Sequence, residues 1–395
     1  MVVKTLDELA IDGRRVFLRL DLNVPLDEEG TITDDTRIQA ALPTIRELIV
    51  RESRIVIGSH LGRPKGERNN AFSMEPVAAR LAHLLDSEII LSEDSVGDGP
   101  RKMAFALREG QIMVLENLRF YPGETGAEDS FAKQLASLSD VYVNDAFGTM
   151  HRSHASITGI PKYLKDRGVG RLAGKEVAAL SKLRAKPEKP FVAIIGGAKV
   201  RDKIELLLSL VAQVDTICIG GAMALTFLSA QGYDLGQSRV ERDAFNLAGK
   251  VMRRADKHNT RVVLPVDHVA TADLKEGAEH QVATNSSFPA GLVAVDIGPA
   301  TIEIIQDTLE DAMTVFWNGP VGVFEIPPFN LGTEQIGKAV ARSNAYSVVG
   351  GGDSVAALRK GGLVPFISHV STGGGASLKF LEGKPLPGLS ALEEI

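Results

Sequence analysis

The 395-residue chain is longer than a single hydrophobic core usually supports, so its length favours two domains. Its 44% hydrophobic and 24% charged residues are typical of a folded globular protein and exclude the disordered and fibrous classes. A formal net charge of −6 argues against a general binder of nucleic acid, so any anion site must be a local arrangement of a few basic residues.

Short β-branched runs alternate with amphipathic stretches along the first part of the chain. The expected strands are Arg15–Leu20, Arg54–Ser59, Gln111–Leu115 and Val141–Asn144, with helices at Arg37–Val50 and Pro76–Leu85. The alternation starts again after residue 190, with expected strands at Pro190–Ile195, Thr216–Ile219, Arg261–Val266, Met313–Trp317 and Ala345–Val349. This alternation predicts βαβ units. The fold class is therefore α/β, with two Rossmann-like domains that have mainly parallel sheets.

A connector helix is expected between the two halves. Val169–Ala185 is typical of one helix, and Pro187 and Pro190 end it and stiffen the exit. The domains are predicted as residues 1–170, a connector helix at 171–187, and residues 188–375. Gly168-Val-Gly170-Arg-Leu-Ala173 matches a dinucleotide-binding pattern by letter, but no strand is expected before it, so we give the match little weight.

Cys218 is the only cysteine, which excludes an intrachain disulfide and favours a reducing, cytoplasmic compartment. The N-terminal residues do not form a secretory signal. No apolar run approaches the roughly 18 residues that span a bilayer. We expect a soluble monomer that binds neither nucleic acid nor membranes.

Four turns that follow expected strands in the first half carry basic and polar side chains. Arg37, at the start of the helix that follows the first strand, joins them. The candidate anion-binding residues are Asp21, Asn23, Arg37, His60, Arg63, Arg119 and Arg152. Ligands of open α/β sheets bind beyond the carboxyl ends of the strands, and the arginine fork suits phosphate and carboxylate. Single arginines of this kind are usually surface ion pairs, but four at successive strand ends predict a site for a small polyanion. The nearby His151 and His154 favour packing or anion contact over a metal site.

Glycine-rich turns follow the expected strands of the second half, at residues 195–199, 220–221, 350–354 and 371–376. Glycine lets backbone N–H groups approach a phosphate closely, and a following helix favours the anion. One such turn is more often only a turn, and there is no P-loop motif, but four in one α/β domain indicate a nucleotide.

Four further side chains extend this prediction. Lys199 and Lys203 are four residues apart, so we expect them to share a helix face and to offer two ammonium groups to phosphates. Asp353 is the best-placed carboxylate for Mg²⁺ held jointly with phosphate oxygens. Glu325 either accepts a hydrogen bond from a ribose or caps a helix, and the sequence leaves both open.

These segments together resemble the phosphoglycerate kinase family from about Lys4 to Leu389. The strings that carry the resemblance, in the family's order, are RLDLNVP, SHLGRP, ENLRF, NDAFGTMHRSHAS, GGAKVRDK, LPVD, WNGPVGVFE, GGGDS and SHVSTGGGAS. The resemblance implies reversible phosphoryl transfer from 1,3-bisphosphoglycerate to MgADP. It also implies that residues 376–395 return to the first domain.

The resemblance assigns the candidate residues to roles. It implies that the seven anion-site residues named above bind 3-phosphoglycerate. It also implies that the nucleotide is bound by Gly197, Lys203, Gly220, Gly221, Asn318, Glu325, Gly351, Gly352, Asp353 and Ser354. Asp353 is its magnesium-associated residue, and Lys199 and Lys203 are its phosphate-binding lysines. The expected catalytic set is Arg37, Lys199, Lys203, Gly373, Gly374 and Gly375.

A carboxylate acceptor is already ionised at neutral pH, since its reference pKa is near 4. The reaction therefore needs the two substrates to be positioned and the charge on the transferred phosphoryl group to be neutralised, rather than a general base. Because the ligands are expected on separate domains, we also expect hinges in the connector helix and near Thr372. Two alternatives stay open here, a non-catalytic nucleotide-binding sensor or scaffold, and a kinase of another small carboxylic acid.

Overall fold

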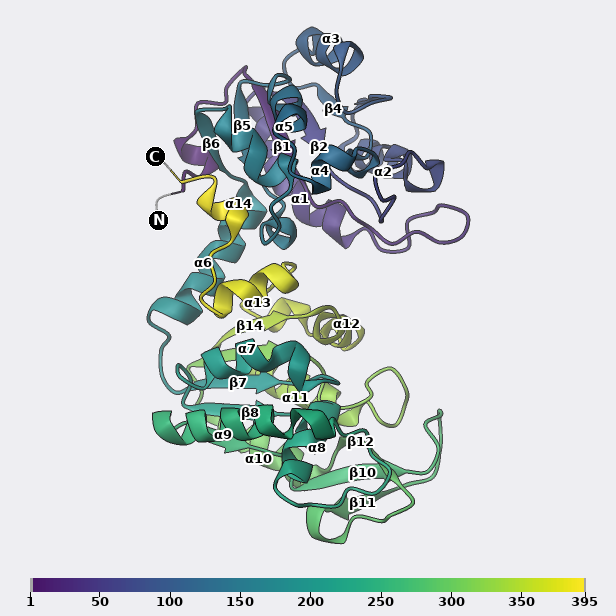
Figure 1. The fold of residues 1–395 in the computed structure, drawn as a ribbon, viewed down its shortest axis with the longest axis vertical. Helices are drawn as coiled ribbons and strands as arrows, with labels where there is room; N and C mark the ends of the chain where they lie inside the picture. Colours follow the sequence, from purple (N-terminus) through teal and green to yellow (C-terminus); the bar gives the residue numbers. More distant parts are fainter. Residues whose placement is uncertain (1–2, 394–395) are drawn as a thin grey trace. The chain divides into compact units, whose positions relative to one another are not determined.

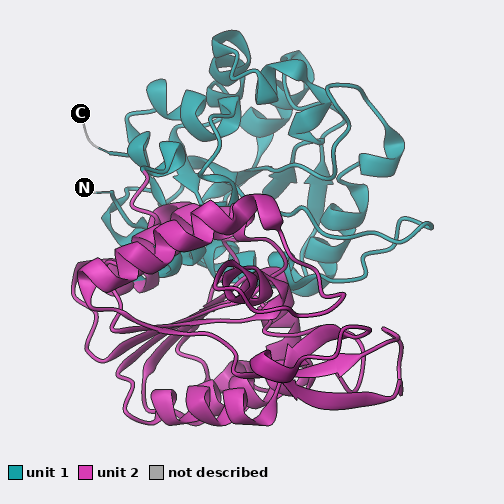
Figure 2. Ribbon diagram, turned by 60° about the horizontal axis from the view of Figure 1, so that its bottom comes forward, with its two compact units in different colours: residues 1–178, 385–395 teal, residues 179–384 magenta. Residues whose placement is uncertain are grey.

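The computed structural model describes residues 3–393, and the chain divides into two compact units (Figures 1 and 2). Unit 1 comprises Met1–Ala178 with Pro385–Ile395, and unit 2 comprises Ala179–Lys384. The division therefore falls inside the helix α6 (Arg171–Ala185). Within the described residues, no helix is both long and apolar enough to cross a membrane.

Unit 1 is built on one six-stranded parallel sheet in the order β3-β4-β2-β1-β5-β6. Its strands are β1 (Arg15–Arg19), β2 (Arg54–Gly58), β3 (Ile89–Leu91), β4 (Ile112–Val114), β5 (Val141–Asn144) and β6 (Asp166–Val169). The central strands β1, β2, β4 and β5 are almost wholly buried, because both faces of a parallel sheet are covered. All four residues of β5, for example, are buried.

The helices of unit 1 lie between its strands along the chain or follow them. They are α1 (Thr36–Val50), α2 (Glu75–Leu85), α3 (Asp98–Ala106), α4 (Pro122–Thr125), α5 (Asp129–Ala136), the first part of α6, and α14 (Pro387–Ser390). In α1, Ile38, Leu42 and Ile45 recur at helical spacing and are all buried. The last helix joins this unit through Gly388, whose N–H donates to the carbonyl of Met150.

Unit 2 contains a second six-stranded parallel sheet, in the order β15-β14-β13-β7-β8-β9. Its strands are β7 (Phe191–Ile195), β8 (Thr216–Ile219), β9 (Arg261–Val263), β13 (Thr314–Asn318), β14 (Tyr346–Gly350) and β15 (His369–Val370). A separate antiparallel sheet, β11-β10-β12, is formed by β10 (Asp267–Thr271), β11 (His280–Thr284) and β12 (Val293–Ile297). The predicted α/β class with mainly parallel sheets is confirmed.

Two groups of mutually contacting helices belong to unit 2. One comprises α7 (Val200–Leu210), α8 (Gly221–Ala230), α9 (Phe245–His258) and α13 (Gly375–Leu381), and the other α10 (Pro299–Glu310), α11 (Leu331–Arg342) and α12 (Gly352–Lys360). Three of these helices follow strands of the large sheet closely: α8 and α12 begin two residues after β8 and β14, and α7 begins five residues after β7. The strand-to-helix turns therefore gather at one edge of the large sheet.

Two expectations about the connector were wrong. Val169 is the last residue of β6 and not part of the helix, which begins at Arg171. A strand therefore does lead into the Gly168-Val-Gly170 pattern. Packing explains both glycines, because a Cβ at Gly168 would lie 2.4 Å from the carbonyl oxygen of Lys4, and one at Gly170 would lie 2.3 Å from the carboxyl carbon of Asp145.

Candidate active site

The residues of the predicted anion site follow the carboxyl ends of β1, β2, β4 and β5, which are neighbours in the sheet of unit 1. Hydrogen bonds join them in a chain. The Arg37 guanidinium donates to Asp21 Oδ1 at 3.2 Å and to the carbonyl oxygen of Asn23 at 3.0 Å. Asn23 Oδ1 accepts from the N–H of Gly62 at 2.7 Å, and the carbonyl of Gly62 accepts from Arg119 at 2.8 Å. Arg63 follows Gly62 and is exposed.

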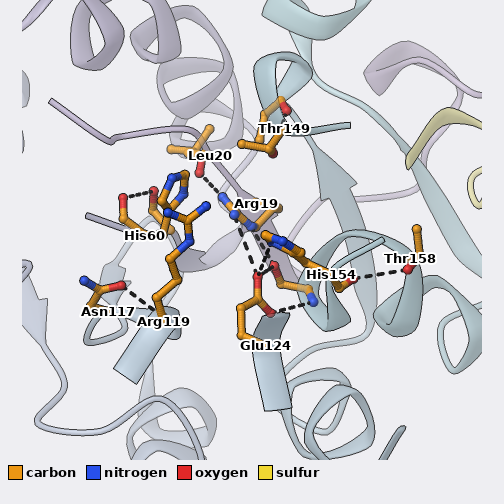
Figure 3. Close-up of polar contacts among 12 residues, drawn as sticks. Arg19, Leu20, His60, Asn117, Arg119, Glu124, Thr149, His154 and Thr158 are labelled. Atoms are coloured by element: carbon orange, nitrogen blue, oxygen red, sulfur yellow. Dashed lines mark hydrogen bonds and ion pairs between the residues drawn. The ribbon is translucent and has the colours of Figure 1, made fainter. Parts of the chain in front are cut away.

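Figure 3 shows a group of basic side chains that includes His60, Arg119, Arg19 and His154. Arg119 is 8% exposed and His60 is 3% exposed. Burial, followed by the charges of Arg152 and Arg19, lowers the pKa of Arg119 to about 10. Burial and the same arginine charges also hold the pKa of His60 well below its usual value, and lower that of His154 to about 4. The structure thus brings Arg152, from the segment after β5, into one electrostatic cluster with Arg119 and His60.

Three buried nitrogen atoms in this cluster have no hydrogen-bond partner among the described residues. They are Arg19 Nη2, His60 Nδ1 and Arg119 Nε. Unsatisfied buried donors are rare in folded proteins, because each costs about 1–3 kcal/mol. A group of them around arginine side chains indicates a place that a polar or anionic ligand completes.

Sequence reasoning missed two residues that support the cluster, Arg19 and Glu124. Both side chains are fully buried, and Arg19 Nη2 lies 3.9 Å from Glu124 Oε1. Glu124 accepts from the N–H of Ser156 at 2.9 Å and from its hydroxyl at 2.6 Å, and its Oε1 lies 3.7 Å from His154 Nδ1. Arg19 also donates to the Ser156 hydroxyl at 2.7 Å and to the carbonyl of Leu20 (Figure 3). An arginine inside an apolar strand was the available signal.

Unit 2 has a cavity of about 520 Å³ beside its glycine turns. Four predicted nucleotide-binding residues line it, namely Gly197, Gly221, Glu325 and Asp353. Its other walls come from α8 and from β12, with Leu225, Val293 and Val295 among the apolar residues. A volume of this size and a largely apolar lining with a few polar groups are typical of small-molecule sites.

Most of the other predicted nucleotide-binding residues lie in the turns next to this cavity. Lys203 donates from Nζ to the carbonyl oxygens of Gly196, at 2.5 Å, and Asn318, at 2.9 Å. Ser354 accepts from the N–H of Gly319 through its hydroxyl at 2.6 Å. Gly319 has φ +97°, and a Cβ there would lie 2.2 Å from the carbonyl of Gly196, so no other residue fits this turn without movement. Gly220 is the N-cap of α8, and Gly351 that of α12.

Lys199 and Lys203 do not share a helix face, so that expectation was wrong. Lys199 is the extended N-cap residue of α7 and is exposed, whereas Lys203 lies inside the helix and is partly buried. Burial lowers the pKa of Lys203 to about 8, and the charge of Asp353 opposes this shift. Lys203 and Asp353 are therefore close enough to interact.

The last predicted set, Gly373–Gly375, lies at the start of α13 and does not line the cavity. The N–H of Gly373 donates to the Ser371 hydroxyl at 3.2 Å. Gly374 and Gly375 are exposed. A role for their N–H groups stays a prediction.

An arginine-rich anion site on one α/β unit and a glycine-lined cavity on another are typical of two-domain kinases of small acids. A family model described as phosphoglycerate kinase matches residues 6–384. A phosphoglycerate kinase of Anaeromyxobacter sp. (strain Fw109-5) is 52% identical over 395 residues, covering 100% of both chains. One of Chlorobium chlorochromatii is 48% identical, covering 99% of this chain and 100% of its own.

Solved structures agree with these relatives. The phosphoglycerate kinase of Coxiella burnetii has a TM-score of 0.91 and 41% identity, with 99% of each chain covered. That of Pyrococcus horikoshii OT3 has a TM-score of 0.85 and 34% identity, with 98% of each covered. The chain belongs to the phosphoglycerate kinase family, and it is a phosphotransferase.

Proposed function

We propose that unit 1 binds 3-phosphoglycerate or 1,3-bisphosphoglycerate and that unit 2 binds ADP or ATP. The observation that carries the first assignment is the cluster of Arg119, Arg152 and His60, with buried nitrogen atoms of Arg119 and His60 that have no hydrogen-bond partner among the described residues. The second rests on the cavity lined by Gly197, Gly221, Glu325 and Asp353. Asp21, Asn23, Arg37 and Arg63 complete the proposed acid site.

Mg²⁺ is proposed to accompany the nucleotide, with Asp353 as its protein ligand. Asp353 is an exposed carboxylate in the first turn of α12 and lines the cavity, so it fits a hard cation that shares phosphate oxygens. When bound, Mg²⁺ would neutralise charge on the nucleotide phosphates. The residues Gly351–Ser354 would hold those phosphates at the start of the helix, where backbone N–H groups favour anions.

In the proposed mechanism the protein positions two anionic partners and cancels charge. The acceptor carboxylate is ionised, so no proton has to be removed from it. Arg37 would neutralise the moving phosphoryl group from the acid side, and Lys203 and Lys199 from the nucleotide side. The N–H groups of Gly373–Gly375 are proposed to contribute in the same way.

We also infer a monomeric cytoplasmic enzyme. The single cysteine, Cys218, is buried and free, as suits a reducing compartment.

A coupled assay with 3-phosphoglycerate, MgATP and a reductive readout tests the proposed function. We expect turnover that requires both substrates and the divalent cation. Turnover only with a different small carboxylic acid would support the other kinase instead. Nucleotide binding without turnover on any acid would support the sensor or scaffold.

We expect kcat/KM for the nucleotide to depend on pH through the ammonium group of Lys203. Burial places its pKa at about 8, so in the free enzyme the ammonium loses its proton as pH rises through that value. We expect kcat/KM for the nucleotide to fall above pH about 8, because kcat/KM reports groups of the free enzyme. In Lys203→Arg the guanidinium stays charged, so this fall should disappear. A decline at the same pH in the variant would exclude Lys203 as its source.

A further inference from the structure

Asp296 is a buried carboxylate that the proposed mechanism does not use. It lies in β12, is 4% exposed, and forms part of the wall of the cavity in unit 2. Burial raises its pKa to about 7, although N–H groups of Gly332 and Ile297 oppose the shift. A carboxylate in such a place costs free energy relative to an apolar side chain of similar size. Its neighbours in the cavity wall, Val295 and Ile297, show that apolar residues are otherwise used there.

One hydrogen bond of Asp296 reaches the start of α11, the helix that follows the segment 319–330 after β13. Asp296 Oδ2 accepts from the N–H of Gly332 at 2.6 Å, in the first turn of α11. Oδ1 accepts from the N–H of Ile297 at 2.9 Å. The bond to Gly332 satisfies one of the free donors at a helix start with a negative charge, which is the favoured arrangement.

The backbone of Gly322, near the beginning of the segment, also lies against this carboxylate. A Cβ at Gly322 would lie 1.9 Å from Asp296 Oδ1, so the backbone of Gly322 contacts the carboxylate directly. A Cβ at Gly332 would lie 2.3 Å from the same oxygen. The N–H of Val323 donates to the carbonyl of Val295 at 2.8 Å, which joins the segment to β12 beside Asp296.

The segment held in this way lines the cavity through Pro320, Gly322, Val323 and Glu325. We propose that Asp296 is a positioning residue for the nucleotide: its ionised carboxylate binds the start of α11 at Gly332 and packs against Gly322, and so keeps the segment 319–330 beside β12 and shapes the part of the cavity that receives the nucleoside. The inference rests on the proposed nucleotide site in unit 2. Asp296 acts through the backbone of the segment and does not need to touch the ligand.

Adenosine is the probe for the test, because it has no phosphate that titrates near neutral pH. The variant is Asp296→Asn, and the control is Asp307→Asn, an exposed aspartate on the following helix. The amide can accept from only one of the two N–H groups and must present a donor to the other. We therefore expect the Kd of adenosine to rise roughly tenfold in Asp296→Asn, as expected for a lost hydrogen bond to a charged group. The control should be unchanged.

The wild-type enzyme supplies a readout that does not depend on how the variant folds. Protonation of Asp296 weakens its bond to Gly332, so the Kd of adenosine should rise roughly fivefold between pH 8 and pH 6. Stability should move in the opposite direction, because a carboxyl whose pKa is raised on folding favours the folded state as pH falls through about 7. A purely structural Asp296 would show only this gain in stability.

Other ionisable groups lie on the elements around Asp296 and on the cavity wall. They are Asp267 and His268 on β10, Glu334 and Lys338 on α11, and Arg239, Glu325 and Asp353 along the cavity. Burial lowers the pKa of His268, so its titration falls below the ordinary histidine range. The pKa of Lys203 is about 8, so its loss of a proton lowers the affinity for phosphate groups as pH rises. This change with pH is opposite in direction to the one expected from Asp296, and it does not affect adenosine, which has no phosphate.

The outcomes separate this inference from the proposed function. If adenosine and ADP both fail to bind the wild-type enzyme, the nucleotide site of unit 2 is wrong and the inference falls with it. If both bind, but the Kd of adenosine is the same in Asp296→Asn and in wild type, the positioning role alone is overturned. Should Asp296→Asn not fold, a wild-type Kd that stays constant from pH 8 to pH 6 overturns the role by itself.

Discussion

Replacing Arg37 by alanine is expected to lower kcat at least about a hundredfold while the affinity for nucleotide stays near normal. Arg37 lies at the start of α1, its side chain is 43% exposed, and it is oriented by Asp21 and by the carbonyl of Asn23. Those contacts hold the guanidinium at the edge of the proposed acid site. Alanine removes a charge that we propose to act on the moving phosphoryl group.

Steady-state kinetics with both substrates and calorimetric titration with ADP measure the two parts of this prediction. Arg46→Ala is the matched control, because Arg46 is an exposed arginine farther along the same helix. Its kcat should be close to that of the wild type. Near-normal turnover in Arg37→Ala would remove Arg37 from the mechanism. A large loss of ADP affinity would show that the substitution disturbs more than the acid site.

Glu124→Gln should lower the free energy of unfolding of unit 1 by about 3–5 kcal/mol, the range observed when one member of a buried ion pair is removed. Glu124 and Arg19 are both fully buried and lie 3.9 Å apart. Glutamine keeps the size of the side chain but leaves the charge of Arg19 uncompensated. It also replaces one of the two oxygens that accept from Ser156.

Hydrogen exchange read by mass spectrometry resolves the two units, and the amides of β1 and β5 report on unit 1. Their exchange should accelerate in Glu124→Gln, whereas that of β7 and β13 in unit 2 should not change. Glu128→Gln, at an exposed position, is the control. A loss of less than about 1 kcal/mol at β1 and β5 would mean that the carboxylate does not compensate Arg19, as for an exposed ion pair.

Nine of the twelve strands of the two large sheets were predicted because their signals are local, whereas β3, β6 and β15 were not. Buried parallel strands are short apolar runs, and the helices between them repeat apolar residues at helical spacing. The predicted strand Arg54–Ser59 differs from β2 (Arg54–Gly58) by one residue. The antiparallel sheet of β10 to β12 was not predicted. Its edge strand β11 has only one buried residue in five, so it carries little apolar pattern.

The errors at the candidate sites have a common cause, which is that spacing along the chain does not specify where a helix begins. Lys199 and Lys203 have helical spacing, but α7 starts at Val200 and leaves Lys199 outside. Val169 continues the apolar pattern of the connector, yet it pairs with Asn144 in the sheet. For Val169 the pairing with β5 decided the boundary, and in both cases the local sequence was compatible with either state.

The sequence by itself determined the α/β class, the arginine and glycine turns, and the resemblance to a kinase family, because each of these is carried by residues close together in the chain. Only the tertiary structure decided which polar side chains are buried together. Arg19 meets Glu124, and Asp296 meets Gly332, across separate elements. The physical reason is that the free energy of a buried charge depends on partners that folding brings from distant parts of the chain.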